Sequence, residues 1–485
     1  MEININLKGL NMEPLVVKPN LSNFVKSLRD IGYTFEVAVA DILDNSITAN
    51  AREVRIHAEA EPNLFFSMLD DGFGMSNSEL IEAMRLAAKN PEDEREKEDL
   101  GRFGLGLKTA SFSQCKKLTV ISKKNNNISI KQWDLDFISN KNEWLLKTPE
   151  ITVFENLPLF LDLKKQETGT LIIWEEIDNF PKYDLPLKLD SLRKHLSLVF
   201  HRFLEGAGTF KSFNIIINNN RLKAFNPFNI NHPATQQLAS EKLKINGSTI
   251  YIYPFVLPHH SKLSQEEYER YATEEGYTKS QGFYLYRANR LLIHGTWWGL
   301  HRTNDAHKLV RVKIDIPNDQ DTYWGIDIKK STAKPISEIR NDLKRIIKQV
   351  TEKGSRPYSG RGRKIEDRNT TNFWEIKHVN GGVRFSLNKK HPILDKVRED
   401  VNSYITQLLD SYLMGVEAYL PLDAIQAKLQ LSPHEIKQES ALNFEEVQAL
   451  AELLKSKGLD KEYIDSLIRT ELFKDFKELI ANGEK

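Results

Sequence analysis

The sequence contains a single cysteine, Cys115, among 485 residues. One thiol excludes a disulfide framework and any zinc module built on cysteines, and it is typical of a reducing cytoplasm. No apolar run is long enough to cross a membrane. The opening stretch MEININLKGLNMEPL lacks the basic head and apolar run of a signal peptide. We therefore expect a cytoplasmic protein without a membrane partner.

The chain also lacks an excess of charge of either sign. It has 68 Lys and Arg against 67 Asp and Glu, which gives a net charge of +1. This balance predicts no general attraction to nucleic acid, so any such binding needs a local basic patch. The apolar content of 40% is enough for buried cores, and the length predicts two or three domains.

Helix and strand patterns alternate over the first 220 residues, which predicts an α/β or α+β domain, and we expect an α+β fold. Apolar residues at helical spacing predict one helix over residues 20–50. Another helix is expected to be capped by Ser76 or Ser78, with Glu79 as the capping-box partner. Strands are expected at 53–60, 64–72, 116–124, 127–135, 170–177 and 213–220, and then at 248–257, 282–293 and 309–316. An amphipathic helix at 335–354 closes the second block of strands.

The stretch ADILDNSITANA, residues 40–51, is mostly apolar yet carries two acids and an amide. Asp41 and Asn45 are four residues apart, so a helix would place them on one face. An amide oxygen suits Mg²⁺, and a carboxylate one turn earlier can orient an attacking water. A helix cap or a hydrogen-bonded pair in a core would explain the same residues. Asp44 is an alternative base, but we expect it to point elsewhere on the helix.

Two glycine-containing motifs follow. In DDGFGM the Asp70 carboxylate can accept a hydrogen bond from an exocyclic amine, while glycines allow close backbone approach. A turn that ends a strand is the alternative. In GRFGLGLKTAS a glycine loop opens a helix whose free N–H groups can hold phosphate, and Lys108 adds a charge. Leu107 breaks the P-loop spacing, so a capped flexible loop is the alternative there.

A fourth motif, ETGTLIIW, places Thr170 at the start of a strand, where its hydroxyl can support the contact between Asp70 and a base. The four motifs, in this order, resemble the GHKL ATPase superfamily of gyrase B, Hsp90, histidine kinases and MutL. The lysine after the last glycine of the second glycine box looks most like the MORC branch and its bacterial relatives. The resemblance covers residues 20–220 strongly and 221–350 more weakly.

This resemblance implies four regions. Residues 1–220 would form a Bergerat α/β sandwich that binds ATP, and 221–354 a transducer domain of the ribosomal S5-like type. Residues 355–372 would be a basic linker, and 373–485 a helical C-terminal interaction region.

The resemblance also implies roles for individual residues. Asn45 would coordinate Mg²⁺, and Asp70 with Thr170 would contact the adenine. The segment 89–100 would be a lid. The other residues expected at the nucleotide are Gly72, Gly74, Met75, Gly101, Gly104, Leu105, Gly106 and Lys108.

The general base falls on Asp41, where the family usually has Glu. Asp is one methylene shorter, so ATP binding is better supported than rapid hydrolysis. Asn50, where relatives often have Gly, is expected in a left-handed conformation that Asn tolerates.

In the family, a transducer lysine reaches the γ-phosphate. The stretch WGIDIKKSTAKP offers Lys329, Lys330 and Lys334, and we favour Lys330, although a solvated basic loop would explain any one of them. Upstream, RANRLLIHGTWWGL contains Arg287, Arg290, Trp297 and Trp298, which could bind nucleic acid. Exposed strand ends and core tryptophans would explain these residues as well. The basic segment 355–364 is either a phosphate contact or a solvated linker.

We therefore expect a Mg²⁺-dependent ATPase that acts as an ATP-gated homodimeric switch on DNA or on a protein that processes DNA. The DNA partner is inferred from analogy to the family alone. A role in phage defence is inferred in the same way, because the genes of bacterial relatives often lie among phage-defence genes. The alternatives are an Hsp90-like chaperone and a nucleotide-sensing scaffold that does not hydrolyse ATP. A histidine kinase is disfavoured because the first histidine, His57, follows the Asp41–Asn45 motif.

Overall fold

The computed structural model describes residues 17, 19–86, 106–206, 213–327, 330, 332–354, 369–379, 382–431 and 442–481. The chain forms two compact units, of which the first comprises 1–255, 279–303 and 310–347. The second comprises 256–278, 304–309 and 348–485. Among the helices described, none is both long enough and apolar enough to cross a membrane.

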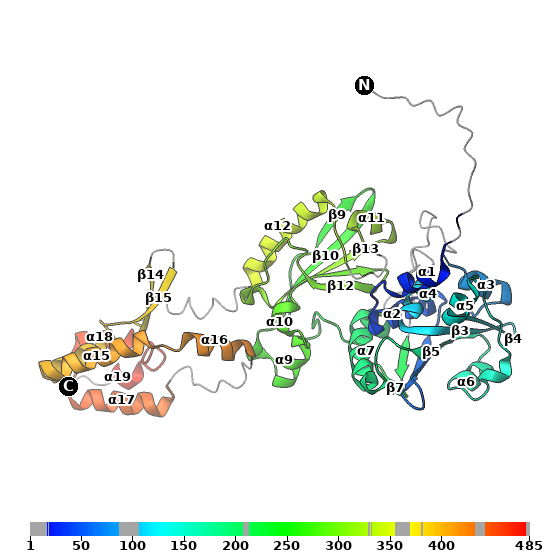
Figure 1. The fold of residues 1–485 in the computed structure, drawn as a ribbon. Helices are drawn as coiled ribbons and strands as arrows, with labels where there is room; N and C mark the ends of the chain where they lie inside the picture. Colours follow the sequence, from blue (N-terminus) through cyan, green and yellow to red (C-terminus); the bar gives the residue numbers. More distant parts are fainter. Residues whose placement is uncertain are drawn as a thin grey trace, which may run out of the picture. The chain divides into compact units, whose positions relative to one another are not determined.

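The first unit contains a seven-stranded sheet with the order β4-β3-β5-β2-β1-β6-β7 (Figure 1). Neighbouring strands run antiparallel except for β1 and β6, which are parallel. The strands are β1 Glu53–Glu59, β2 Phe65–Asp70, β3 Cys115–Lys124, β4 Asn127–Asp134, β5 Gly169–Ile177, β6 Asn214–Ile217 and β7 Asn220–Arg221. All six strands predicted for this part of the chain are present.

Eight helices accompany this sheet in the described residues. They are α1 Leu21–Arg29, α2 Phe35–Thr48, α3 Asn77–Met84, α4 Gly106–Gln114, α5 Leu135–Lys141, α6 Phe160–Lys165, α7 Leu185–Val199 and α8 His201–Leu204. Side chains of α2, α4 and α7 form a large core against one face of the sheet. A smaller core on the other face includes side chains of α6, and Figure 1 shows the position of this helix.

Strand β2 is buried on both faces because it lies in the middle of the sheet. Phe66 and Met68 belong to the core that contains α2, whereas Phe65 and Leu69 belong to the core that contains α6. Since successive side chains of a strand alternate between faces, Asp70 at the end of β2 lies on the same face as α2.

The single helix predicted over residues 20–50 is wrong, because the chain forms α1 and α2 with a break between them. Gly32 in the break has a φ of +82°, and the Thr34 side chain accepts a hydrogen bond from the Val37 N–H and so starts α2. The other end of α2 agrees with expectation: Asn50 lies just beyond it with a φ of +57°.

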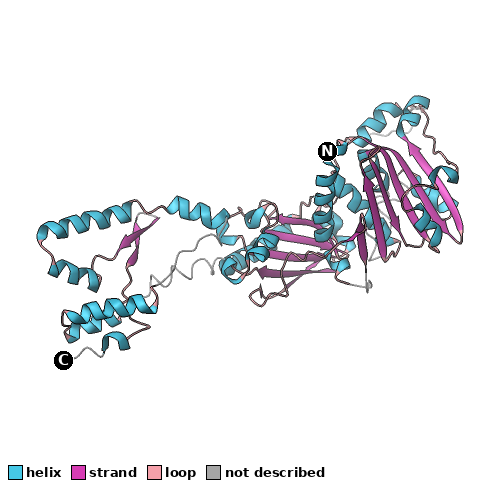
Figure 2. Ribbon diagram, turned by 90° about the horizontal axis from the view of Figure 1, so that it is seen from below, coloured by secondary structure: helices cyan, strands magenta, loops and turns pink. Residues whose placement is uncertain are grey.

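A second, six-stranded sheet has the order β12-β11-β13-β10-β8, with β9 paired to β10 (Figure 2). Its strands are β8 Gln236–Gln237, β9 Glu241–Ile245, β10 Ser248–Val256, β11 Gly282–Arg287, β12 Arg290–Thr296 and β13 Val310–Ile316. In sequence, α9 Gln265–Ala272 and α10 Gly276–Lys279 lie between β10 and β11, and α11 Asp321–Trp324 and α12 Ser337–Gly354 follow β13. As predicted, α12 is amphipathic, and its Ile339, Leu343, Ile346 and Val350 are buried.

The C-terminal region is largely helical, as predicted, with α14 Pro392–Asp400, α15 Ser403–Ala418, α16 Leu422–Leu431, α17 Phe444–Ser456, α18 Lys461–Ile468 and α19 Glu478–Ala481. It also contains a hairpin that the sequence did not suggest, β14 Trp374–Val379 and β15 Gly382–Leu387 (Figure 2). Helices α17, α18 and α19 share a core. Helix α15 buries none of its residues and exposes Tyr404, Leu408 and Tyr412.

Candidate nucleotide site

Helix α2 organises the candidate site, because its second half carries four polar side chains in six residues. Asp41, Asp44 and Ser46 are buried, whereas Asn45 is exposed. Since a helix turns by about 100° per residue, neighbouring positions project in different directions. One short stretch of α2 therefore supplies both buried anchors and one accessible amide.

The Asp70 carboxylate is held by three donors from three elements. Its Oδ2 accepts from the Ser46 hydroxyl at 2.8 Å. Its Oδ1 accepts from the backbone N–H groups of Gly72 at 3.0 Å and Thr170 at 3.2 Å. Burial raises the pKa of Asp70 to about 6, although these three hydrogen bonds lower it in part. Asp70 is therefore a fixed carboxylate that can still ionise at neutral pH.

Thr170 supports Asp70 in a different way from the one expected. Residues Asp70 and Thr170 are paired across β2 and β5, so the Thr170 backbone N–H reaches the carboxylate. The Thr170 hydroxyl instead pairs with the Ser122 hydroxyl at 2.9 Å. Ser122 also accepts from the Met75 N–H at 2.8 Å. Ser122 thus connects the DDGFGM turn to β5.

The two glycines of DDGFGM are required by close packing. A Cβ on Gly72 would lie 2.8 Å from the Ala49 Cβ and 2.9 Å from its carbonyl oxygen. Gly74 has a φ of +64°, and a Cβ there would lie 2.0 Å from the Lys123 carbonyl oxygen. The turn can therefore press against the end of α2 and against β3 only because both positions lack side chains.

At the other side of α2, Asp41 and Asp44 share a buried cluster with two cations. Lys330 Nζ lies 3.1 Å from Asp41 Oδ1 and 2.6 Å from Asp44 Oδ2. Arg290 Nε donates to Asp44 Oδ1 at 2.7 Å, and its Nη2 lies 3.6 Å from Asp41 Oδ1. Both acid side chains are 2% exposed, Arg290 is 4% exposed and Lys330 is 10% exposed. Two acids and two cations balance each other's charge, as burial requires.

The expectation that Asp44 points away from Asp41 is wrong. Residues three apart on a helix lie nearly on one face, and both carboxylates contact the same ammonium group. The Tyr33 hydroxyl donates to the second oxygen of Asp41, Oδ2, at 3.0 Å. Burial and the Asp41 charge raise the pKa of Tyr33, so it remains a proton donor. Each oxygen of Asp41 is therefore held in place.

Of the three candidate lysines, the structure brings Lys330 to Asp41. Lys330 has a φ of +55°, and its N–H bonds the Asp327 carbonyl at 3.0 Å. Lys334 is exposed, and Lys329 lies outside the described residues.

The glycine loop is described only at its end, because Gly101, Gly104 and Leu105 lie outside the described residues. Gly106 begins α4, and a Cβ on it would lie 3.9 Å from Asp41 Oδ2. The start of α4 thus adjoins the Asp41 carboxylate. Lys108 is buried and donates to the Ala83 carbonyl oxygen at 2.9 Å, and burial lowers its pKa to about 8.

In the RANRLLIHGTWWGL stretch, Trp297 is a core tryptophan, as the alternative expected. The expectation of exposed strand ends is wrong for the arginines, because Arg287 and Arg290 are buried. Trp298 is half-buried and stacks on Phe283 at a centroid distance of 4.8 Å. Arg287, Arg290 and Trp297 therefore offer no surface to nucleic acid. The basic segment 355–364 lies outside the described residues.

Sequence reasoning missed Tyr33, Ser46 and Ser122, and it missed the role of Arg290. Ser46 directly follows Asn45 and could have been found by following α2 for one more residue. The sequence contains no signal of the pairing between Arg290 and Asp44, because 246 residues separate the two.

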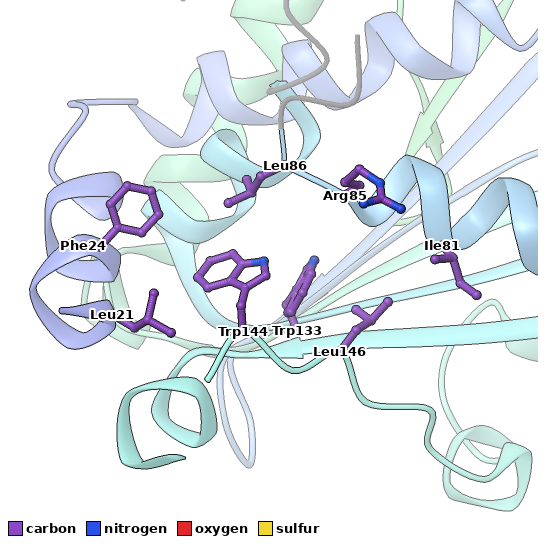
Figure 3. Close-up of a pocket in the computed structure, with 8 residues that line it drawn as sticks. All are labelled: Leu21, Phe24, Ile81, Arg85, Leu86, Trp133, Trp144 and Leu146. Carbon is purple, nitrogen blue, oxygen red and sulfur yellow. The ribbon is translucent and has the colours of Figure 1, made fainter. Parts of the chain in front are cut away.

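A separate apolar cavity of about 410 Å³ contains none of the predicted site residues. In Figure 3, Trp133 and Trp144 lie side by side at its centre, with Phe24 and Leu21 of α1 on one flank. The remaining lining residues are Ile81, Arg85, Leu86 and Leu146. The Trp133 indole donates to the Met84 carbonyl at 3.0 Å, which fixes this wall.

Comparison with known proteins agrees with this geometry. Residues 33–170 match the family described as histidine kinase-, DNA gyrase B- and HSP90-like ATPase. The ATPase MORC2B of Mus musculus is 31% identical over 96 residues, which are 19% of this chain and 9% of that protein. The ATPase morc-1 of Caenorhabditis elegans is 29% identical over 108 residues, which are 22% of this chain and 12% of that protein.

The chain thus spans about a tenth of the length of these two relatives. The matched family region contains Tyr33, Asp41, Asn45, Asp70 and Thr170, which are residues of the site described above. Residues 33–170 therefore form a domain of the GHKL ATPase superfamily, with similarity to MORC ATPases.

Proposed function

We propose that this protein binds ATP with Mg²⁺, hydrolyses it slowly, and acts as an ATP-gated homodimeric switch on DNA or on a DNA-processing partner. One observation carries the proposal. On α2, the exposed Asn45 is next to Ser46, which donates a hydrogen bond to Asp70. Asn45 also lies one turn after Asp41, which contacts Lys330. Helix α2 thus carries a metal ligand and a candidate general base, and through Ser46 it holds the acceptor for a base at the end of β2.

The Asp70 end fits adenine. An ionised carboxylate accepts a hydrogen bond from the exocyclic amine of adenine, and its other partners are all donors that keep it oriented. We propose that Gly72 contributes by packing against the end of α2, which keeps its N–H on the Asp70 carboxylate. We propose that Gly74, Met75 and Thr170 shape this end through their contacts with β3 and Ser122.

The Asp41 end fits hydrolysis. In the proposed step a water oxygen attacks the γ-phosphorus, the bond to the β-γ bridging oxygen breaks, and Asp41 accepts the proton of the water. Lys330 would offset the negative charge that develops on the phosphoryl oxygens. Tyr33 and Lys330 fix the direction of the short Asp41 side chain. We propose that Gly101, Gly104, Leu105, Gly106 and Lys108 lie near the phosphates.

The site fits Mg²⁺ through Asn45. Its amide nitrogen donates to the Asp41 carbonyl at 3.4 Å, which orients its exposed Oδ1, a hard oxygen ligand. Among the described residues, no group of three or more His, Cys, Asp or Glu is arranged to hold a metal. One protein oxygen completed by phosphates and water is the arrangement that Mg²⁺ favours. The ion would neutralise phosphate charge.

Replacing Asn45 by Ala should abolish the Mg²⁺-dependent part of ATP affinity. The methyl group offers no ligand to the ion, while the exposed position leaves the core intact. Titration of ATP with and without Mg²⁺, by calorimetry, measures this effect in the wild type and the variant. Asn50→Ala is unsuitable as a control because of its positive φ, so Thr48→Ala, also exposed on α2, serves instead. Equal Mg²⁺ dependence in Asn45→Ala and wild type would remove the metal assignment.

The switch part of the proposal concerns the regions beyond residues 33–170. We propose the division into 1–220, 221–354, 355–372 and 373–485, in which the second sheet serves as the transducer that responds to nucleotide. Lys330 supports this, because it follows the second sheet in the chain and yet contacts Asp41. The C-terminal region would bind the partner, and α15 offers exposed apolar side chains for it.

ATP turnover of the full chain, with and without duplex DNA, tests the function. A turnover rate that rises with DNA is expected, and light scattering should show dimers when a non-hydrolysable ATP analogue is added. Stimulation by an unfolded client protein instead would favour the Hsp90-like alternative. Tight ATP binding without turnover under any condition would favour the nucleotide-sensing scaffold. The observation that favours this alternative is that Asp occupies position 41.

A further inference from the structure

We propose that Arg290 is a positioning residue for ATP hydrolysis, which sets the geometry of Asp41 and Lys330 through Asp44. This inference rests on the proposed function, because it assigns a role in that same hydrolytic site. Arg290 would not contact the nucleotide. It would hold the Asp44 carboxylate, which in turn holds the ammonium group that lies beside Asp41.

The backbone fixes where Arg290 begins. Ala288 and Asn289 have φ values of +45° and +68° and join β11 to β12 by a two-residue turn. Positive φ at both central residues is the mark of a tight hairpin turn whose twist matches its strands. Arg290 is the first residue of β12, directly after this turn, so its Cα has little freedom.

The surroundings of Arg290 direct its charge toward the two carboxylates. The guanidinium lies over the Phe200 ring at 5.6 Å, and its Nη1 donates to the Leu291 carbonyl oxygen at 3.2 Å. The nearby His195 is neutral, because burial and the Arg290 charge lower its pKa to about 3. The acids in contact with Arg290 are Asp44 at 2.7 Å and Asp41 at 3.6 Å.

The Asp44 carboxylate is shared between the two cations in an ordered way. Its Oδ1 accepts a hydrogen bond from the Arg290 Nε, and its Oδ2 accepts one from the Lys330 Nζ at 2.6 Å. The shorter of the two Lys330 contacts is therefore the one to Asp44, and the contact to Asp41 is 3.1 Å. If Arg290 is removed, Asp44 can rotate and carry the Lys330 ammonium group with it. Asp41 then loses the partner that fixes its Oδ1.

The same hairpin provides a matched control. Arg287 is paired directly with Arg290 across β11 and β12. It is also buried, and it forms an ion pair with Asp321 at 2.5 Å. This pair has the same chemistry as Arg290–Asp44 and is equally buried, and its acid lies on α11 whereas Asp44 lies on α2. A purely structural role would make the two arginines equivalent.

The experiment compares Arg290→Met, Arg290→Lys, Asp44→Asn and Arg287→Met in the full chain. ATP turnover, ATP affinity and the melting temperature are measured for each. We expect Arg290→Met and Asp44→Asn to lower kcat by about 100-fold, the loss that a displacement of about 1 Å can cause. ATP affinity should change by less than about threefold, because neither group contacts the nucleotide. Arg287→Met should lower the melting temperature to a similar extent and leave kcat of the folded protein unchanged.

The Arg290→Lys variant and one further, double variant separate position from stability. Arg290→Lys keeps the charge but lacks the planar fork, so kcat should stay low although the buried charge is retained. The double variant Asp44→Asn/Arg290→Met removes both charges of the pair. It should regain melting temperature relative to either single variant, because neither charge is left unpaired, and its kcat should remain low.

Three outcomes overturn the inference. A kcat in Arg290→Met equal to that of the wild type would show that Arg290 does not position the site. A kcat that recovers together with the melting temperature in the double variant would reduce its role to stability. An equal loss of kcat in Arg287→Met would show that any buried pair of the hairpin has the same effect. A wild type that binds ATP without turnover would instead contradict the proposed function.

Discussion

Replacing Asp41 by Asn or Ala should lower ATP turnover by about 10²- to 10⁴-fold, the range that a general base contributes. The carboxylate is 2% exposed and is held by Tyr33 and Lys330, so it is the acceptor that the structure fixes beside the start of α4. ATP affinity should remain within a few-fold of wild type, because the loss concerns the proton that moves during hydrolysis. Steady-state turnover and a nucleotide-binding titration measure the two quantities separately.

Asp41→Asn is the sharper of the two variants because it keeps the shape of the side chain. It removes one negative charge from a cluster of two acids and two cations, so some loss of stability is expected, and melting temperatures must show that the variant is folded at the assay temperature. Asp41→Glu adds the methylene that relatives have at this position. If Asp41→Asn turned over ATP at the wild-type rate, Asp41 would not be the base. If the wild type were inactive and Asp41→Glu active, the chain would be a nucleotide-sensing clamp.

Replacing Asp70 by Asn should weaken ATP binding by about 10- to 100-fold, which corresponds to the loss of a hydrogen bond to a charged group. The carboxylate accepts from Ser46, Gly72 and Thr170. In the Asn variant, the side-chain NH₂ group would point either at these donors or at the adenine amine. In both cases two hydrogen-bond donors would face each other. Calorimetric titration of ATP measures the loss. An unchanged affinity would remove Asp70 from adenine recognition.

The pH dependence of binding gives a second readout of Asp70. Its pKa of about 6 means that the carboxylate becomes protonated in the folded protein as the pH falls below that value. Affinity in the wild type should therefore fall by up to about tenfold per pH unit below pH 6. The ratio of wild-type to Asp70→Asn affinity cancels the titration of ATP itself, and this ratio should fall with decreasing pH. A ratio that is constant from pH 5 to 8 would contradict the assignment.

The raised pKa of Asp70 affects folding stability in the opposite direction, so that stability rises where ATP affinity falls. The folded pKa of Asp70 lies above the ordinary value of 3.8, so the folded state binds the proton more tightly than the unfolded state does. The stabilisation from this group is complete below about pH 4 and is lost as the pH rises through about 6. Nucleotide binding therefore requires the ionised form of this carboxylate, whereas folding favours the protonated form. Burial causes both effects because it raises the pKa of Asp70.

The sequence by itself determined those features that depend on short spacings. Asp41 and Asn45 lie on α2 as their spacing predicted, and the capping box of Ser76 and Glu79 starts α3. The glycines of DDGFGM meet backbone and side-chain atoms at distances that exclude a Cβ. Such features are local, because helix periodicity and backbone sterics act over a few residues. The order of four such motifs was enough to indicate the ATPase superfamily.

Only the tertiary structure decided which groups complete the site. Lys330 is 289 residues from Asp41, and Arg290 is 246 residues from Asp44. The sequence could offer Lys330 as one of three candidates, but it placed Asp44 on the wrong side and gave Arg290 a possible surface role. The physical reason is that a buried charge must find a partner wherever the fold brings one. Spacing along the chain determines the direction of a side chain, whereas the packing of distant segments decides what it meets.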